Sequence, residues 1–367
     1  MAFYFRLPVI TSLTIEQQAV LNEPGPIAVS GGPGTGKSVV SLWRHIRNHD
    51  TKKRKSLLLT YTKSLESYLA ASAMSENANS GSCVNRTLRW TYRPQNDKYD
   101  EIIIDEAQDV PINTYKLLNE LAPMVSYSAD DNQILYPTES VSEEELRLLF
   151  VTNRPFVLHE NFRNTVELVQ FVRSIFPTRL ISPGKLNGPK PRLICSDGDK
   201  DVQIKIVIDI INTFKSNTHN IAILLPFTPN VDEWFKILQE KGMQCSKYTS
   251  NESAVGVIEN IHVTTFKSAK GLEFDTVIVP NFDQFRYNIA NYRVIDENDY
   301  YVVFTRSRRN LMLIDNSVTN NKKCALDFLS LQIQRAIIDV DYNYLKDIGQ
   351  AAKTSPSKTN NNDDLPF

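Results

Sequence analysis

The chain has 367 residues, of which 41% are hydrophobic and 23% are charged, and its formal net charge is −1. This composition is typical of a soluble globular protein, and the length suits two domains of ordinary size. The near-neutral charge excludes binding of nucleic acid through a global positive field, so any such contact must use a local patch.

Two further patterns concern location and covalent chemistry. No apolar run approaches the ~18 residues that cross a bilayer, and the segment from Met1 to Ile10 lacks the features of a secretion signal. We therefore expect a cytoplasmic protein without membrane contact. The four cysteines form no C-x-x-C pair, so we expect neither a zinc site nor a disulfide framework.

Short apolar runs alternate with helical patterns along the chain, which predicts an α/β fold with mostly parallel sheets. In the first half, we expect strands at Ile27–Ser30, Ser56–Thr60, Glu101–Asp105 and Val125–Ser128, and helices at Val39–Asn48, Ser64–Ala73 and Ile112–Ala122. In the second half, we expect strands at Arg192–Cys195, Ile221–Leu225, Ile261–Thr264, Thr276–Val279 and Leu311–Ile314, and helices at Thr165–Ile175, Asp201–Phe214 and Val231–Lys241. The Asn/Ser-rich stretch from Ser75 to Ser82 predicts a surface loop.

These elements divide into two sets of similar size that join near Asn153–Leu158. We therefore predict a first domain over residues 1–153 and a second over 154–345. Residues 346–367 are polar and end in an acidic cluster, so we expect a disordered tail.

The most informative motif is a complete phosphate-binding loop of the form G-x-x-x-x-G-K-S. It lies between a predicted strand and a predicted helix, which is the order that the motif requires. Its backbone N–H groups can cradle phosphate oxygens, and the helix N-terminus adds a partial positive charge. Lys37 can reach the β- and γ-phosphates, and the Ser38 hydroxyl can ligate Mg²⁺. The loop consists of Gly31, Gly32, Pro33, Gly34, Thr35, Gly36, Lys37 and Ser38.

A second acidic motif follows the apolar run Ile102-Ile103-Ile104, where two carboxylates, Asp105 and Glu106, end a predicted strand. Asp105 can hold Mg²⁺, commonly through water, and Glu106 can orient or deprotonate the attacking water. Hydrolysis of a nucleoside triphosphate needs both a metal ion and such a base. We therefore expect ATP and Mg²⁺ as cofactors.

The sequence Asp105-Glu106-Ala107-Gln108-Asp109 resembles the D-E-A-Q-D signature of UvrD/Rep-like superfamily 1 DNA helicases. The remaining motifs of that family follow in order from Leu13 to Leu313. The resemblance implies two RecA-like P-loop NTPase domains with the ATP site in the cleft between them. It also implies that Gln17 reads the adenine edge, Gln133 senses the γ-phosphate and Glu273 lies near the ribose. Arg163 and Arg306 would be the arginine fingers, which reach ATP when the cleft closes.

The same resemblance implies contacts with single-stranded DNA. The sequence Leu59-Thr60-Tyr61-Thr62-Lys63 is similar to the motif that grips the strand. Tyr61 is a candidate for stacking on a base, although a tyrosine at a strand end is equally often half-buried packing. Hydroxyl and amine groups that could bond phosphate oxygens belong to Thr60, Thr62, Lys63 and Thr265.

The chain departs from the family in two respects. Both large insertion domains are minimal or absent, and Ile134-Leu135-Tyr136-Pro137 follows Gln133 in place of the aromatic-Arg-Gly-Ala sequence of the family. These departures favour a compact DNA-stimulated motor and weaken the case for duplex unwinding.

Three functions therefore stand as hypotheses. The first is an ATP-dependent helicase or translocase on single-stranded DNA or DNA junctions, for which the resemblance suggests 3′ to 5′ movement. The second is a nucleotide-gated, DNA-sensing ATPase subunit that regulates an effector such as a nuclease, and the third is an RNA motor.

The sequence ends in Asp363-Asp364-Leu365-Pro366-Phe367, which resembles the tip of bacterial single-stranded-DNA-binding protein tails. Two acids, a stiff proline, an aromatic anchor and a free carboxylate suit capture by a basic, apolar pocket on a partner protein. The alternative is a solubilising tail without a partner.

Overall fold

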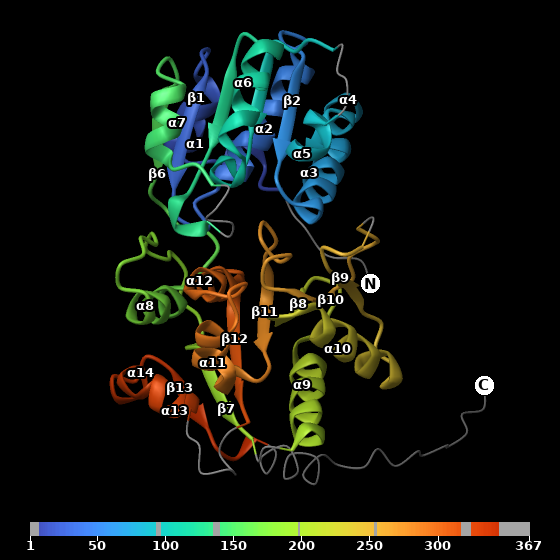
Figure 1. Ribbon diagram of the computed structural model, residues 1–367, viewed down its shortest axis with the longest axis vertical. Helices are drawn as coiled ribbons and strands as arrows, with labels where there is room; N and C mark the ends of the chain where they lie inside the picture. The colour runs from blue at the N-terminus through green and yellow to red at the C-terminus, as the bar shows by residue number, and fades with distance from the viewer. Residues whose placement is uncertain are drawn as a thin grey trace, which may run out of the picture.

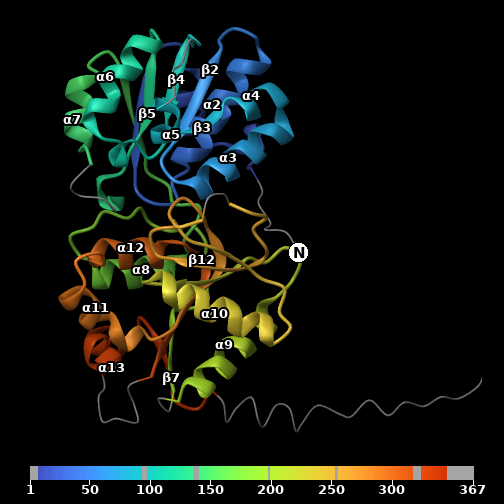
Figure 2. The ribbon, with the colours of Figure 1, turned by 45° about the vertical axis from the view of Figure 1, so that its right-hand side comes forward.

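The computed structural model describes residues 7–92, 97–134, 140–196, 199–252, 255–316 and 324–344, with the backbone alone for Cys324. Two α/β domains lie one above the other and meet along a single seam (Figure 1). The seam is still visible when the molecule is turned by 45° (Figure 2). Within each of the two sheets, all neighbouring strands in the described ranges pair in parallel, so the predicted α/β class with mostly parallel sheets is confirmed.

The first domain contains a six-stranded sheet in the order β3-β2-β4-β5-β1-β6. Its strands are β1 (Ile27–Gly31), β2 (Ser56–Thr60), β3 (Val84–Arg86), β4 (Glu101–Ile104), β5 (Val125–Ser128) and β6 (Arg154–Leu158). Its α-helices are α1 (Ile15–Asn22), α2 (Lys37–Asp50), α3 (Lys63–Glu76), α4 (Ala78–Ser82), α5 (Thr87–Thr91), α6 (Ile112–Leu121) and α7 (Glu143–Leu149). Three short 3₁₀ turns are η1 (Ile10–Ser12), η2 (Ala107–Asp109) and η3 (Asp131–Gln133).

The second domain contains a seven-stranded sheet in the order β13-β7-β12-β11-β8-β10-β9. Its strands are β7 (Arg192–Cys195), β8 (Ile221–Leu225), β9 (Ser246–Tyr248), β10 (Ile261–Thr265), β11 (Phe274–Val279), β12 (Ser307–Asp315) and β13 (Asp339–Asp341). Its helices are α8 (Val166–Ile175), α9 (Lys200–Phe214), α10 (Thr228–Glu240), η4 (Phe282–Gln284), α11 (Phe285–Asn291), α12 (Glu297–Thr305), α13 (Cys324–Phe328) and α14 (Ser330–Gln334).

The central strands are buried along their whole length because helices cover both faces of a parallel sheet. β2, β4, β8 and β10 contain no exposed residue, which explains the apolar runs in β2, β4 and β8. Side chains cap two of the helices that follow strands: the Thr62 hydroxyl accepts from the Leu65 N–H at the start of α3, after β2, and the Thr165 hydroxyl accepts from the Leu168 N–H at the start of α8, after β6. The residues that follow each strand therefore have fixed positions at the edge of the sheet.

The structure also changes some sequence expectations. Residues 75–82 form the end of α3 and the short helix α4, so the predicted loop there is wrong. Asn77 caps α4 through its side chain, which accepts from the N–H groups of Asn79 and Ser80. β6, which we placed at the junction between the domains, pairs with β1 in the first sheet. That sheet therefore extends to Leu158.

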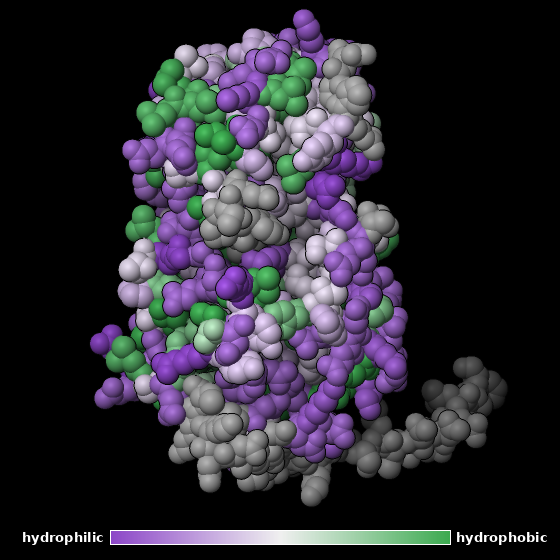
Figure 3. All heavy atoms as spheres, in the orientation of Figure 1, coloured by the Kyte–Doolittle hydropathy of each residue, from purple (hydrophilic) through white to green (hydrophobic). Residues whose placement is uncertain are grey.

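The three-residue strands β3, β9 and β13 lie at or near sheet edges and were not predicted, because so short a run carries no readable alternation. On the face drawn in Figure 3, hydrophobic side chains form small patches among hydrophilic ones. None of the helices in the described ranges is both long and apolar enough to cross a lipid bilayer.

Candidate nucleotide and nucleic-acid site

The phosphate-binding loop connects the end of β1 to the start of α2, as the sequence predicts. Gly34 and Gly36 adopt left-handed φ angles of +76° and +89°, which side-chain-bearing residues rarely adopt. A Cβ at Gly34 would lie 2.2 Å from Asn161 Oδ1, and one at Gly36 would lie 2.6 Å from Gln17 Nε2. Glycine is therefore required at both positions by backbone angle and by close neighbours. The N-terminus of the 14-residue helix α2 faces the loop, so a phosphate there meets the positive end of the helix dipole.

The Lys37 side chain is held inside this loop. Its ammonium group donates to the carbonyl oxygens of Gly31 at 2.6 Å and Gly32 at 3.1 Å, and it lies 3.3 Å from Asp130 Oδ2. These acceptors keep a nearly buried ammonium group paired. The same group can exchange the carbonyls for phosphate oxygens without leaving its position beside Asp130.

Asp105 follows β4 directly and offers a site for a cation. Its Oδ1 accepts from the Ser128 hydroxyl at 2.5 Å, whereas the buried Oδ2 has no hydrogen-bond partner among the described residues. Burial and the adjacent Glu106 carboxylate raise the pKa of Asp105 to about 6. A bound cation reverses such a shift, because it favours the ionised carboxylate. The donor set of Asp105 and Ser38 therefore fits a Mg²⁺ ion.

The metal would still need other ligands. Within the part of the chain that the structure describes, no three His, Cys, Asp or Glu side chains are grouped so that they could hold an ion by themselves. Mg²⁺ commonly takes one or two carboxylates and completes its shell with substrate phosphates and water.

Glu106 adopts a left-handed backbone (φ 56°), a conformation that is uncommon for residues with a side chain and that concentrates at functional sites. Its Oε2 accepts from Gln108 Nε2 at 2.6 Å and lies 3.5 Å from Lys270 Nζ. Burial alone would raise the pKa of Glu106, but the charges of Lys270 and Lys37 outweigh it and hold this pKa well below its ordinary value. The carboxylate is therefore ionised and fixed in orientation, so it can accept a hydrogen bond from a water molecule and orient it.

A chain of polar contacts connects the phosphate-binding loop to the second domain. From Lys37 it passes to Asp130, and the Gln133 amide donates to the same Asp130 oxygen at 2.5 Å. Gln133 Oε1 then accepts from Arg306 Nη2 at 2.6 Å. Arg306 is buried, and both burial and the charge of Arg163 lower its pKa to about 9. The predicted γ-phosphate sensor and the second predicted finger are thus in direct contact across the seam.

Arg163 and Glu273 form an ion pair at the same seam, with Arg163 Nε 2.7 Å from Glu273 Oε2. The N–H of Phe162, the residue before Arg163, donates to the Gly34 carbonyl at 2.9 Å. Arg163 therefore lies beside the phosphate-binding loop. Glu273 has a second cation, Arg308, at 3.7 Å. Burial raises the pKa of Glu273, but Arg163 and Arg308 overcome this and lower it.

Gln17 contacts the loop from the other side. Its Nε2 donates to the Thr35 carbonyl at 3.1 Å, and its Oε1 accepts from the Thr14 N–H at 3.0 Å in a capping box that starts α1. Both ends of the amide are thus engaged by protein. Its predicted contact with adenine stays a prediction, and the observed role of Gln17 is to support the loop.

The residues predicted to contact nucleic acid gather where the start of α3 meets the end of β10. Lys63 Nζ donates to the Glu252 carbonyl of the second domain at 2.5 Å. The Thr62 hydroxyl caps α3, and the Thr265 hydroxyl donates to Ser268 Oγ at 2.9 Å. Thr60 is buried, and Tyr61 is half-buried against the core of the first domain. Their roles stay predictions. The hydroxyls of Thr62 and Thr265 already form hydrogen bonds within the protein, whereas the buried hydroxyl of Thr60 has no hydrogen-bond partner among the described residues.

Sequence reasoning missed the residue that ties the two domains together most directly. Lys270 is fully buried, and its ammonium group donates to Asp109 Oδ2 and to the Gln133 carbonyl, both at 2.5 Å. Burial would lower the pKa of Lys270, but Asp109 and Glu106 raise it. The lysine belongs to the K-G-L-E sequence, yet nothing local indicates that its partners come from the other domain. Asp130 was also missed: it pairs with Lys37 within the first domain, but the two residues lie 93 positions apart in the sequence.

Comparisons with known proteins agree with this geometry. Residues 16–138, which include the loop, Asp105 and Gln133, match the AAA domain family. A protein of Acanthamoeba polyphaga mimivirus named "Putative ATP-dependent DNA helicase R568" is 25% identical over 232 residues. This match takes in 56% of the chain but only 33% of that protein, so the chain spans about a third of the length of its curated relative. The chain is therefore similar to ATP-dependent helicases in sequence.

Similar solved structures also include helicases. The C-terminal domain of a possible DNA helicase from Lactobacillus plantarum WCFS1 is 22% identical, with 49% of this chain and 98% of that one covered and a TM-score of 0.35. The PRRSV helicase is 13% identical, with 82% and 54% covered and a TM-score of 0.42. The arterivirus nonstructural protein 10 helicase is 13% identical, with 83% and 63% covered and a TM-score of 0.40.

Proposed function

We propose that the protein hydrolyses ATP in the cleft between its two domains and uses the cycle to move on single-stranded DNA. The observation that carries this proposal is the convergence of Arg306 and Lys270, from the second domain, on Gln133 and Glu106 in the first. If these charges contact the nucleotide only when the two domains are closed, ATP binds the closed form more tightly and stabilises it.

Each residue then has a role in the proposed reaction. The Lys37 ammonium group exchanges its hydrogen bonds with the loop carbonyls for contacts with the β- and γ-phosphates. Ser38 and Asp105 would hold the metal. Mg²⁺, when bound, neutralises charge that develops on the phosphates. Glu106 orients the attacking water and takes its proton. Arg163 and Arg306 stabilise the charge on the transferred phosphoryl group, an effect worth roughly 10³–10⁵ in rate for such fingers.

Loss of the γ-phosphate would weaken this grip and let the cleft reopen. This movement would change the contacts with nucleic acid held at the junction of α3 and β10, because Lys63 and Ser64 contact the second domain there. The resemblance of the motifs to UvrD/Rep-like helicases supports DNA as the track and 3′ to 5′ as the direction.

The test is steady-state phosphate release by the purified chain with single-stranded DNA, single-stranded RNA, duplex DNA or no nucleic acid. We expect stimulation by single-stranded DNA above all others, and no turnover by Lys37→Ala, which loses the phosphate-binding ammonium group. Streptavidin displacement from either end of a DNA strand measures direction. Stimulation by RNA alone would select the RNA motor instead, and turnover by Lys37→Ala at the wild-type rate would refute the assigned site.

A second candidate is a nucleotide-gated DNA sensor that regulates an effector such as a nuclease. One observation favours it: β3 and β4 are separated by α5 and a short connection, with no room for an insertion domain that could split a duplex. An unwinding assay on a forked duplex separates the candidates. Strong ATPase activity without unwinding, restored by a partner, would select the sensor.

We also propose that the last five residues, Asp363 to Phe367, bind partner proteins. These residues lie outside the described part of the chain. Their resemblance to single-stranded-DNA-binding protein tails supports capture by genome-maintenance proteins. Deletion of Leu365–Phe367 should abolish retention of such proteins in a pull-down. Unchanged retention would leave the solubilising tail as the explanation.

A further inference from the structure

A cavity of about 320 Å³ lies in the second domain, away from the nucleotide site. It is formed by α9 with the turn after it, the turn after α10, and the first residue of β10. Parallel strands carry the nucleotide-site residues after their C-terminal ends, as Lys270 follows β10. The cavity instead lies where β8 and β10 begin, so neither ATP nor the α3–β10 junction explains it.

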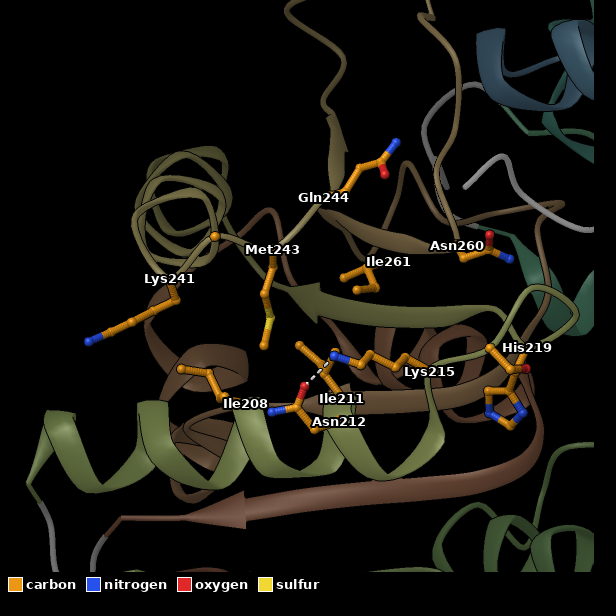
Figure 4. Close-up of a pocket in the computed structure, with 12 residues that line it drawn as sticks. Ile208, Ile211, Asn212, Lys215, His219, Lys241, Met243, Gln244, Asn260 and Ile261 are labelled. Carbon is orange, nitrogen blue, oxygen red and sulfur yellow. Dashed lines mark hydrogen bonds between the residues drawn. The ribbon is translucent and has the colours of Figure 1, made fainter. Parts of the chain in front are cut away.

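The cavity combines an apolar floor with a cationic rim. Figure 4 shows Met243 pointing down from the turn after α10 toward Ile208 and Ile211 on α9. The amine of Lys215 lies beside Ile211 and Asn212, and Lys241 extends outward from the turn after α10. Lys215 Nζ donates to Asn212 Oδ1 at 2.8 Å, and neither lysine forms an ion pair with a carboxylate in the described ranges. The described residues that line the cavity include no Asp or Glu.

This chemistry selects a ligand with acidic and apolar groups side by side. The volume is at the lower end of the range for ligand pockets, which suits one or two side chains better than a large cofactor. Two exposed lysines favour a pair of carboxylates, and isoleucine and methionine side chains favour an aromatic or aliphatic anchor.

The described part of the chain ends in contact with α9, one of the two helices beside the cavity. The last described residue, Tyr344, donates its hydroxyl to Asp209 Oδ2 on α9 at 2.9 Å, one position from Ile208 in the cavity floor. The chain continues from there to Asp363-Asp364-Leu365-Pro366-Phe367. A random coil as long as the 19 residues 345–363 has a root-mean-square end-to-end distance of roughly 24 Å. This span is sufficient, because the segment starts on the helix that forms the cavity.

We propose that the cavity between α9 and α10 is the docking site for the chain's own segment 363–367. Asp363 and Asp364 pair with Lys215 and Lys241, while Leu365 and Phe367 fill the floor. Pro366 limits the conformations lost on docking. A short tether gives an effective concentration of about millimolar, so even a weak site is occupied within one molecule.

Docking would make the tail available to a partner only after it leaves the cavity. The inference does not rest on ATP hydrolysis, and a protein that failed the ATPase test could still pass the test below. It does set a condition on partner capture: a pocket on another protein must compete with the cavity for the same five residues.

Photo-crosslinking of the full-length protein tests where the tail lies, with p-benzoylphenylalanine in place of Phe367. We expect cross-links to residues 208–215 and 241–244, with a yield independent of protein concentration because docking is intramolecular. Lys215→Glu/Lys241→Glu should remove at least about nine-tenths of this product. The matched control is Lys205→Glu/Lys236→Glu, which reverses two exposed lysines on the same helices that do not line the cavity and should leave the yield unchanged.

A binding experiment supplies the second readout. A fluorescein-labelled peptide of residues 358–367 is titrated against full-length protein that carries Leu365→Ala/Phe367→Ala, and against wild type. The peptide should bind the tail variant at least about tenfold more tightly than wild type, whose own tail occupies the cavity. Equal binding to both proteins, cross-links outside the cavity, or a yield that rises with concentration would overturn the proposal. The last outcome would place the tail on a second copy of the chain.

Discussion

Replacement of Lys270 by methionine should loosen the seam between the domains. The methionine side chain keeps most of the volume of lysine but has no charge. In the native protein, the Lys270 ammonium group is fully buried, lies 2.5 Å from Asp109 Oδ2 and 3.5 Å from Glu106 Oε2, and donates to the Gln133 carbonyl. All three acceptors belong to the first domain, whereas Lys270 follows β10 in the second.

The magnitude follows from what the substitution leaves behind. In the closed variant, Asp109 remains buried without the cation at 2.5 Å, and Glu106 loses one of the positive charges that stabilise it. Removal of one partner from a buried pair typically costs about 3–5 kcal/mol. Opening of the seam hydrates the carboxylates and relieves this cost. The free energy of opening should therefore fall by up to that amount, which corresponds to a roughly 10²- to 10³-fold larger open population.

Native-state hydrogen exchange measures the change directly. Amides of residues 105–110 and 266–272 should exchange roughly 10²-fold faster in Lys270→Met. The control is Lys267→Met, which removes a lysine of the same loop whose partner, Asp299 at 2.9 Å, lies in its own domain. That variant should leave exchange in residues 105–110 unchanged.

A double-mutant cycle with Asp109→Asn tests the cause. The two substitutions should be non-additive by at least about 1 kcal/mol, because the single variants break the same contact. Additivity within about 0.5 kcal/mol, or unchanged exchange in Lys270→Met, would refute the reasoning that this lysine holds the seam closed.

The other predictions concern turnover and pH. Glu106→Gln should lower phosphate release by about 10²–10⁴-fold, the usual contribution of a positioned base, while a fluorescent ATP analogue binds at least as tightly because a negative charge near the phosphates is gone; wild-type turnover would exclude Glu106 as the base. Arg306→Ala should lower turnover by roughly 10³-fold with little change in ATP affinity, and Arg306→Lys should not restore it, since lysine lacks the planar fork; an effect on affinity alone would place Arg306 outside the reaction. Burial lowers the pKa of both His45 and His262 to about 4, so the unfolded chain binds protons before the native protein does. Protonation of the unfolded chain therefore lowers the free energy of unfolding as the pH falls from about 6.5 toward 4. At pH 5 the loss is roughly 2 kcal/mol per histidine. Urea unfolding of His45→Asn/His262→Asn should therefore give a flatter pH profile between 7 and 5 than wild type, and parallel profiles would contradict this assignment.

The alternation of apolar runs and helical patterns was enough to predict both sheets and most of their strands. Strands such as β2 and β8 are buried on both faces, and burial imposes a continuous apolar sequence that can be read locally. The phosphate-binding loop is readable for a similar reason: left-handed angles at Gly34 and Gly36 and close neighbours restrict those positions to glycine. The paired acids after β4 are readable because a strand end delivers them to a known edge of the sheet.

Short elements could not be predicted from the sequence. The strands β3, β9 and β13 have three residues each, and pairing with a longer neighbour holds them in place. The stretch at residues 75–82 has the composition of a loop, but Asn77 caps a helical turn there and α4 lies against α3. Position 154 also begins a strand of the first sheet, because its partner β1 is 127 residues earlier in the chain.

The sequence by itself identified the candidate reactive groups, because motif spacing and backbone conformation restrict which residues can stand at each place. Only the tertiary structure decided how those groups pair. Lys270 with Asp109, Arg306 with Gln133 and Lys37 with Asp130 are separated by 161, 173 and 93 positions. The energy of a buried charge depends on what surrounds it in space, and no local pattern in the chain carries that information.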